Sequence, residues 1–404
     1  MMQTRFTGSF TQQEPIPEEA IEAAVAALRG ARLHRYGLRP GEVGEAAALE
    51  REFADWQGSR YCLAVTSGGQ AIQIALRAAA VAPGAPVLTN AFTLAPVPGA
   101  IHAVGARPVL VEIDDDLRLD LDDLARKAEA SGARCLLLSH MRGHLCDMDR
   151  LMEIARAHGI TVIEDCAHTM GARWNGVRSG NFGLAGCFST QTYKHLNSGE
   201  GGLLTSDDPD FMARATILSG SYMLYARHGA GPGPESFEAP RYEMPNLSAR
   251  MDALRAAVLR PQLARLEENT DRWNRRYEAV AAELAGSARI TLPDRPEPER
   301  MVGSSIQFRV PDLDAAGCRD FVARAGARGV ELKWFGSADP LGFTSAHRSW
   351  RYVSAQDLPR TDRVLATLFD MRLPLTFSEA DCTLIGTILR EEAGEVDQRP
   401  AARP

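Results

Sequence analysis

One lysine lies in a setting that would make its amine reactive. Lys194 occurs in the stretch CFSTQTYKHLNSGEGGLLTS, between a cluster of hydroxyl residues and a cluster of glycines. The segments AGCFST before it and GGLLTS after it are typical of short buried strands. Burial disfavours a charged amine, so the position predicts a lysine with a lowered pKa and a nucleophilic nitrogen. The alternative is a solvated loop lysine, which is what most lysines are.

Two further groups fit chemistry at that amine. The segment ITVIED ends on Glu164 and Asp165, and a carboxylate at the carboxyl end of a parallel strand points into the ligand crevice of open α/β sheets. Gly68 and Gly69 follow the apolar segment YCLAV and open a helix, whose free N–H groups bind phosphate. A helix cap or surface turn would also explain the acids, and an ordinary strand-to-helix turn the glycines.

Together, a phosphate cradle, an acid and a buried lysine meet the needs of pyridoxal 5′-phosphate. The lysine would form an aldimine with the cofactor, and the acid would keep the pyridine nitrogen protonated so that the ring acts as an electron sink. The helix N-terminus would take the phosphate. His168, shortly after Asp165, is either a core histidine or lies against the planar ring.

Alternating strands and helices must position these groups. Continuous apolar runs are typical of strands buried on both faces, and their alternation with helices predicts a mostly parallel sheet with right-handed crossovers. The expected strands are 61–65, 85–89, 107–113, 134–140, 160–165, 185–190 and 201–206, and the expected helices are 15–30, 44–58, 67–80, 94–105, 119–132 and 147–159.

The pattern changes after about Leu247. A long helical segment, 251–286, is expected to kink at Pro261, and a mixture of short strands and helices follows it. We therefore expect a large cofactor-binding domain with an N-terminal helical arm over 1–260, and a smaller α+β domain over 261–392. The polar segment 393–404 is predicted to be a disordered tail.

Composition excludes several classes of function. The 404 residues carry a net charge of −7 and no basic run, which argues against a nucleic-acid surface. Apolar stretches fall short of the ~20 residues that a membrane helix needs, and the N-terminus has no apolar signal-peptide core. The seven cysteines form no C-x-x-C pair. They indicate reduced thiols in the cytoplasm, with neither a disulfide framework nor a metal site.

The chain resembles the fold-type I, pyridoxal phosphate-dependent sugar aminotransferases of the DegT/DnrJ/EryC1/StrS group. The resemblance rests on LEREFADWQGSRYCLAVTSGGQA, GAPVLTNAFTLAP, GARPVLVEIDDD, HGITVIEDCAHTMGA, GCFSTQTYKHLNSGEGGLLTSDD and SARMDALRAAVLRPQLARL. It implies a large α/β domain, with a mostly parallel seven-stranded sheet between helices, and a smaller C-terminal α+β domain. It also implies a homodimer whose subunits complete each other's active site.

Residue roles follow from the resemblance by position. Lys194 matches the Schiff-base lysine, Asp165 the partner of the pyridinium nitrogen, and His168 the side chain against the ring. The cofactor phosphate is assigned to the backbone or side chains of Gly68, Gly69, Gln70 and Ser189.

Several positions depart from the family pattern. Gly69 replaces a common threonine, and Leu94 stands where an aromatic often stacks on the ring, so Phe92 is the candidate substitute. Ser248 stands where the family has the asparagine that a neighbouring subunit lends to the phosphate, with Asn246 close by.

The sequence also offers candidates for contacts with the substrate. Arg142 and His144, in SHMRGH where the family has His-Leu-Tyr-Gly, would add positive charge and favour an acidic or phosphorylated substrate; a structural salt bridge is the alternative. The other candidates, for which packing is an equal explanation, are Tyr225, Arg227, His228 and Trp334.

The expected reaction is a ping-pong transamination through the Lys194 aldimine. Glutamate or glutamine would donate the amino group, and a keto sugar, nucleotide-linked or free, or a keto cyclitol would accept it. One alternative is a dehydratase of the same fold, whose members replace the lysine with histidine; here Lys194 is present and His195 is one residue out of place. The other is a non-catalytic sensor or scaffold that keeps the fold.

Overall fold

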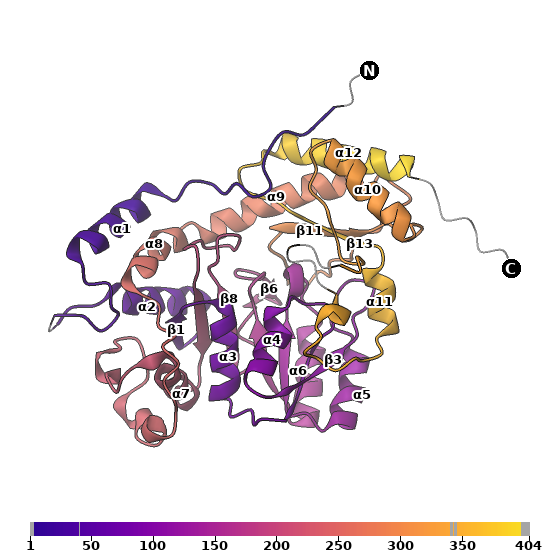
Figure 1. Ribbon diagram of the computed structural model, residues 1–404. Helices are drawn as coiled ribbons and strands as arrows, with labels where there is room; N and C mark the ends of the chain where they lie inside the picture. Colours follow the sequence, from indigo (N-terminus) through magenta and orange to yellow (C-terminus); the bar gives the residue numbers. More distant parts are fainter. Residues whose placement is uncertain (1–3, 40, 340–341, 343–345, 397–404) are drawn as a thin grey trace.

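A seven-stranded sheet forms the centre of the larger part of the molecule (Figure 1). The structure is a computed structural model that describes residues 4–39, 41–339, 342 and 346–396. The strand order is β1-β9-β8-β5-β4-β2-β3. Strand β9 runs antiparallel to both neighbours, and the remaining pairs are parallel. The predicted mostly parallel sheet is therefore confirmed.

The strands of this sheet are the apolar runs of the sequence. Most of their residues are buried, as expected for strands covered on both faces. Their bounds are β1 Tyr61–Val65, β2 Pro86–Asn90, β3 Arg107–Val111, β4 Cys135–Ser139, β5 Thr161–Asp165, β8 Ala185–Ser189 and β9 Gly202–Ser206.

Helices cover both faces of the sheet. Side chains of Asp120, Asp147 and Asp208 accept backbone N–H groups at the starts of three of them, which satisfies amides that have no partner within the helix. The bounds of these helices are α2 Glu45–Gln57, α3 Gly68–Ala78, α4 Pro96–Ala103, α5 Leu121–Ser131, α6 Met148–His158, α7 Pro209–Gly220 and α8 Ala253–Leu263. Helix α1, Glu18–Gly30, packs on α8.

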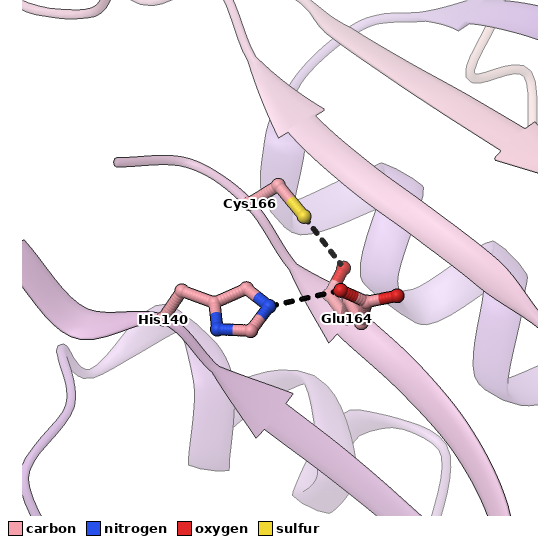
Figure 2. Close-up of side chains that lie close together, drawn as sticks. All are labelled: His140, Glu164 and Cys166. Atoms are coloured by element: carbon pink, nitrogen blue, oxygen red, sulfur yellow. Dashed lines mark hydrogen bonds and ion pairs between the residues drawn. The ribbon is translucent and has the colours of Figure 1, made fainter. Parts of the chain in front are cut away.

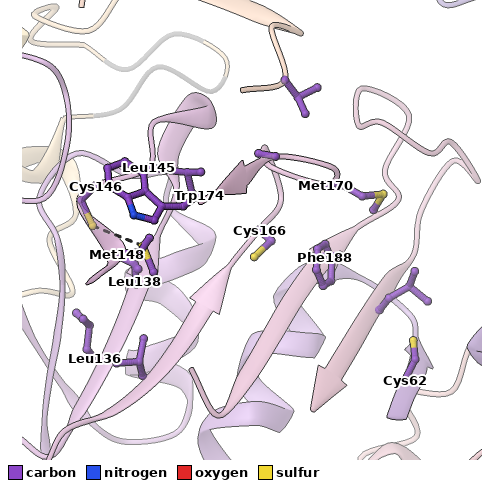
Figure 3. Close-up of a cluster of buried hydrophobic side chains, with 14 of the residues drawn as sticks. Cys62, Leu136, Leu138, Leu145, Cys146, Met148, Cys166, Met170, Trp174 and Phe188 are labelled. Atoms are coloured by element: carbon purple, nitrogen blue, oxygen red, sulfur yellow. Dashed lines mark hydrogen bonds between the residues drawn. The ribbon is translucent and has the colours of Figure 1, made fainter. Parts of the chain in front are cut away.

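Two apolar cores lie against the two faces of the sheet. Successive residues of β4 alternate between them, because side chains of a strand point to opposite faces. Leu136 and Leu138 belong to the core shown in Figure 3, together with Met148 of α6. Leu137 belongs to the opposite core, together with Ile72 of α3. The sheet is thereby fixed between layers, and the ends of its strands keep their relative positions.

The C-terminal part contains a second sheet. Its antiparallel sheet has the order β11-β13-β12 and packs with helices around a third core. Phe6 and Phe10, near the N-terminus, also belong to this core and meet Phe377 edge to face. The bounds are α9 Leu266–Leu284, α10 Ala315–Ala327, α11 Pro359–Leu365, α12 Glu379–Glu395, β11 Ser305–Arg309, β12 Lys333–Trp334 and β13 Leu368–Arg372.

Three local expectations differ from the structure. Pro261 lies within α8, and the helical segment breaks a few residues later, between α8 and α9. Helix α12 runs on through Glu395, so the first residues of the predicted tail are helical, and 397–404 lie outside the described residues. A small antiparallel sheet, β10-β6-β7, was not expected; its strands are β6 Arg173–Trp174, β7 Val177–Arg178 and β10 Glu299–Arg300.

Candidate active site

The carboxyl ends of neighbouring strands gather polar groups around one cavity. Strand β2 ends on Asn90, β4 on Ser139 and β5 on Asp165, and parallel strands end at the same edge of a sheet. The cavity at this edge is lined by Gly68, Gly69, Thr93, Asp165, Ser189 and Lys194, among others. Residues expected from the sequence to act on one ligand thus share one cavity.

Lys194 lies in the loop between β8 and β9, with its side chain half-buried. Its Nζ atom is 2.8 Å from Nε2 of His168. Burial lowers the pKa of Lys194 to about 7, Arg142 adds to this effect, and the Asp165 carboxylate opposes it. The pKa of His168 lies well below its usual value because of burial and the nearby lysine, so its ring is neutral at pH 7. The amine is therefore near the midpoint of its titration at neutral pH.

Asp165 faces the cavity and is buried. Its Oδ2 atom accepts the hydroxyl of Ser139 at 3.1 Å, and Oδ1 accepts the N–H of Ala167 at 3.2 Å. Burial raises its pKa, and the Ala167 hydrogen bond and the charge of Lys194 oppose that rise. The carboxylate is thus held from two sides while still lining the cavity.

Glu164, the preceding residue, faces the other side of the strand. Figure 2 shows the imidazole of His140 directed at its carboxylate, with Nε2 2.9 Å from Oε2. The same carboxylate accepts backbone N–H groups of Gly180, Phe182 and Gly183 at 2.8–3.0 Å.

Cys166 brings a thiol to the same place. His140, Glu164 and Cys166 form a group of the kind that can ligate a metal, and all are buried. Both oxygens of Glu164 are already occupied by hydrogen-bond donors, and the Cys166 thiol contacts the carbonyl of Glu164. The hydrogen bonds to the loop at 180–183 explain why the Glu164 carboxylate is buried.

The N-terminus of α3 packs directly against the sheet. A Cβ atom on Gly68 would lie 2.8 Å from Cβ of Ser189, and one on Gly202 would lie 2.4 Å from the carbonyl oxygen of Ser67. The N–H of Gln70 donates to Oγ of Ser67, so this amide is engaged as a helix cap. Gly68 and Gly69 are the first two residues of the helix, whose amides have no partner within it. They are the amides that can meet an anion in the cavity.

Arg142 and His144 are parts of a buried network. Arg142 forms an ion pair of 2.6 Å with Asp370 of β13, and Gln307 joins Asp370 to His144 with hydrogen bonds of 2.8 Å. Burial lowers the pKa of His144 well below its usual value. Contrary to expectation, His144 therefore adds no positive charge, and Arg142 forms the structural salt bridge that was the alternative.

Phe92 packs away from the cavity. It meets Phe335 edge to face, with ring centroids 5.1 Å apart, in a small apolar cluster between the two parts of the molecule. Among the described residues, the cavity lining includes Leu94 and not Phe92. Trp334 is half-buried and donates its indole N–H to the carbonyl of Ala366 at 2.8 Å.

His228 is also held by structural contacts. Its Nε2 atom lies 3.2 Å from the Arg35 guanidinium, and its Nδ1 atom lies 3.2 Å from the hydroxyl of Tyr36. Arg35 in turn forms a buried bidentate ion pair with Glu50 of α2. Burial lowers the pKa of His228, so the ring is neutral and fully engaged.

The remaining candidates lie at the surface. Tyr225 stacks on Phe237 with centroids 4.4 Å apart, and Arg227 is exposed. Asn246 and Ser248 are exposed as well, with the Ser248 N–H bonded to Oδ1 of Asn246 at 2.9 Å. The structure does not bring these four candidates to the cavity of the same chain.

His195 points away from the Asp165 side of the cavity. Its Nε2 atom lies 3.0 Å from the hydroxyl of Ser304, and its ring meets Trp273 edge to face. This placement agrees with the expectation that the neighbour of Lys194 would be directed elsewhere.

Some groups near the site had not been expected from the sequence. Thr93 and Ser139 line the cavity; Ser139 ends β4 and Thr93 lies three residues after the end of β2, and this position near strand ends is the signal that could have identified them. Arg372 of β13 lies over the ring of Tyr193 at 3.8 Å. Lys333 has a pKa lowered to about 8 by burial and by Arg372. Long-range pairing of the C-terminal sheet brings them here, and no local pattern marks them.

The chain is similar to known aminotransferases. The profile of the DegT/DnrJ/EryC1/StrS aminotransferase family matches residues 16–390. The chain is 36% identical over 267 residues to the dTDP-3-amino-3,4,6-trideoxy-alpha-D-glucose transaminase of Streptomyces venezuelae, covering 64% of each protein. It is 34% identical over 245 residues to the L-glutamine:scyllo-inosose aminotransferase of Streptomyces griseus, covering 60% of this chain and 57% of that one. Both alignments span less than two thirds of the relative.

A solved structure matches nearly the whole chain. The crystal structure of DesV from S. venezuelae in complex with a ketimine intermediate superimposes with a TM-score of 0.81 and 27% identity, covering 98% of this chain and 100% of that one. The match shows the same fold type.

Among the described residues, no helix is both long and apolar enough to span a bilayer.

Proposed function

The chain belongs to the DegT/DnrJ/EryC1/StrS aminotransferase family, and we propose that it transfers an amino group from glutamate or glutamine to the keto group of a sugar or cyclitol. The relatives named above act on an amino-deoxy sugar nucleotide and on scyllo-inosose, which supports this range of acceptors. The observation that carries the proposal is the Lys194 amine, near the midpoint of its titration, in one cavity with Asp165 and the N-terminus of α3.

The cavity fits pyridoxal 5′-phosphate. The phosphate would be held by the amides of Gly68 and Gly69 and by the hydroxyl of Ser189. Gly68 has no side chain, whereas a Cβ at this position would fill the space where the helix end meets Ser189. Asp165 would hold the ring nitrogen, and Lys194 would be the point of covalent attachment. When bound, the cofactor supplies an electron sink for the carbon that exchanges its amino group.

Proton transfer falls to Lys194. With its pKa near 7, Nζ can both take and return a proton at the pH of the cell, which is what a general base and acid requires. The neutral His168 ring, 2.8 Å from Nζ, orients the amine. Asp165, held by Ser139 and Ala167, keeps its negative charge directed at the cavity.

The acceptor is proposed to carry an anionic group. Arg372 and Lys333 lie in the C-terminal sheet, and the positive charge of Arg372 lowers the pKa of both Lys333 and Lys194, as like charges do. Arg142 is paired with Asp370, so the proposal of a phosphate, a nucleotide diphosphate or a carboxylate on the substrate rests on the charges of Arg372 and Lys333. Seven buried cysteine thiols support a reducing, cytoplasmic compartment.

We further propose a homodimer that shares its active sites. Ile21, Val25 and Leu28 of α1 are spaced so that they share one face of the helix, and they are 41%, 37% and 53% exposed. A second copy of the chain would cover this face. Asn246 and Ser248, exposed on the same chain, would then reach the partner's phosphate, and Tyr225 and Arg227 its substrate. Sedimentation should give a dimer, and Val25→Lys should weaken it.

Covalent labelling tests the activity. Protein purified with pyridoxal 5′-phosphate should be yellow, and glutamate or glutamine should bleach the band. Borohydride reduction followed by peptide mass mapping should then place a pyridoxyl group on Lys194. A colourless protein would support the scaffold alternative. A panel of keto sugars and keto cyclitols, with and without phosphate or nucleotide, offered to the aminated form would identify the acceptor.

A further inference from the structure

A chain of hydroxyl groups leads to Asp165 along the wall of the cavity. The Thr93 hydroxyl donates to Oγ of Ser139 at 2.8 Å, and the Ser139 hydroxyl donates to Oδ2 of Asp165 at 3.1 Å. Thr93 is 1% exposed and Ser139 3%, so bulk water does not replace these contacts. Both side chains also line the cavity that holds Lys194.

The donor and acceptor roles in this series of hydrogen bonds are fixed by the neighbouring groups. An ionised carboxylate only accepts hydrogen bonds, so the proton of Ser139 must point to Asp165 and its oxygen must accept from Thr93. The backbone N–H of Ser139 donates to Oδ1 of Asn90 at 3.0 Å, which ties β4 to the end of β2. Ser139 and Asp165 are also register partners on neighbouring parallel strands. The hydroxyl therefore has one available orientation.

We propose that Ser139, supported by Thr93, is a positioning residue that keeps Asp165 ionised and turned toward the ring nitrogen of the cofactor; this rests on the proposed function. Each carboxylate oxygen has two acceptor positions. Ser139 takes one on Oδ2 and Ala167 one on Oδ1, which leaves acceptor capacity toward the cavity. Hydrogen bonds to the charged form favour it and offset the burial that disfavours it.

Isosteric variants isolate the hydroxyls. Ser139→Ala removes the donor to Asp165, and Thr93→Val removes only the support of that donor. Thr89→Val is the matched control, because Thr89 is equally buried on β2 and its hydroxyl has no hydrogen-bond partner among the described residues. Thr93→Ser keeps the hydroxyl and should therefore behave like the wild type.

Two readouts do not depend on turnover. Titration of the apo chain with pyridoxal 5′-phosphate gives its dissociation constant, which should rise about tenfold in Ser139→Ala, as expected for a lost hydrogen bond to a charged group. The rise should be smaller in Thr93→Val and absent in Thr89→Val. The ¹⁵N NMR shift of labelled cofactor reports whether the ring nitrogen is protonated. In Ser139→Ala this shift should move toward that of the unprotonated ring, and the change with rising pH should occur at a lower pH than in the wild type.

The outcomes separate this proposal from the proposed function. A wild-type chain that binds no cofactor overturns both. A wild type that binds it, with a Ser139→Ala variant that keeps the affinity and the nitrogen shift, overturns the positioning role alone. Thermal unfolding of each apo variant checks the fold. If Ser139→Ala does not fold, Thr93→Val decides, since an unchanged nitrogen shift in that variant also overturns the proposal.

Discussion

Two neighbouring carboxylates at the end of β5 have opposite surroundings. Glu164 points into the scaffold, where His140 and the backbone of the 180–183 loop occupy both of its oxygens. Asp165 points into the cavity, with one donor on each oxygen and Lys194 nearby. Two carboxylates one position apart are thus divided by the alternation of a strand between the protein interior and the cavity, which supports a structural role for the first and the proposed chemical role for the second. The number of donors that each carboxylate already holds shows which role it has.

The largest effect should come from the cavity face. Lys194→Ala removes the amine that we propose attaches the cofactor and transfers protons, so glutamate-dependent transamination should fall by at least about 10⁴-fold. The thermal midpoint should stay near that of the wild type. Lys127→Ala, a change at a lysine paired with Asp123 on α5, is the control and should keep full activity. Substantial activity in Lys194→Ala would refute the assignment of the cavity.

Asp165→Asn tests the chemical carboxylate with little change in shape. The amide cannot hold a proton on the ring nitrogen, so activity should fall by about 10³-fold, as for other lost electrostatic contacts in active sites. Stability of the apo chain should be equal or higher, because a buried charge is removed. Calorimetry and turnover measured together check this. A large loss of stability with little loss of activity would reverse the roles of the two carboxylates.

Glu164→Ala should show the opposite balance. It leaves His140 and several backbone N–H groups buried without their acceptor, so the free energy of unfolding should fall by about 4 kcal/mol. Denaturant titration of the apo chain measures this change. Glu164→Gln, which keeps one acceptor oxygen, should lose less. Wild-type stability in the alanine variant would mean that the 180–183 loop is held by other contacts.

Arg372→Met should change the pH dependence of the cavity face alone. Cofactor attachment needs a neutral amine, so its rate in the wild type should rise with pH to a midpoint near 7 and level off above it. Arg372 is one of the charges that lower the pKa of Lys194. Its removal should raise that pKa and move the midpoint to higher pH. Stopped-flow absorbance measures the rate, and Arg390→Met, on α12, is the control.

The smallest effect should come from metal removal. Both carboxylate oxygens of Glu164 already accept hydrogen bonds from the protein. Treatment with EDTA should therefore change neither the thermal midpoint nor the activity. A midpoint that falls with the chelator and recovers with Zn²⁺ would mean that His140, Glu164 and Cys166 bind a metal.

Local patterns predicted most of the fold and the centre of the site. The strands of the large sheet are apolar runs, Asp165 ends one of them, and the glycines of α3 and Lys194 lie in segments that follow two others, so nearby residues marked them. Contacts between distant segments were not predictable. The partner of Arg142 lies 228 residues away in β13, and the neutral state of His144 follows from burial in that same network. Phe92 was assigned by analogy to the ring, but packing against Phe335 decides its place.

Two glycines beside the proposed phosphate pocket, Gly69 and Gly202, differ in how freely they can be substituted. Position 202 admits no side chain, because its Cβ would lie 2.4 Å from the backbone of Ser67. Position 69 is open, with only Ser67 Oγ at 3.9 Å from a Cβ placed there. A saturation library should therefore recover almost nothing at the first position and a range of small polar residues at the second. Substitution at residue 69 could therefore change the proposed contact with the phosphate without disturbing the packing of α3 against the sheet.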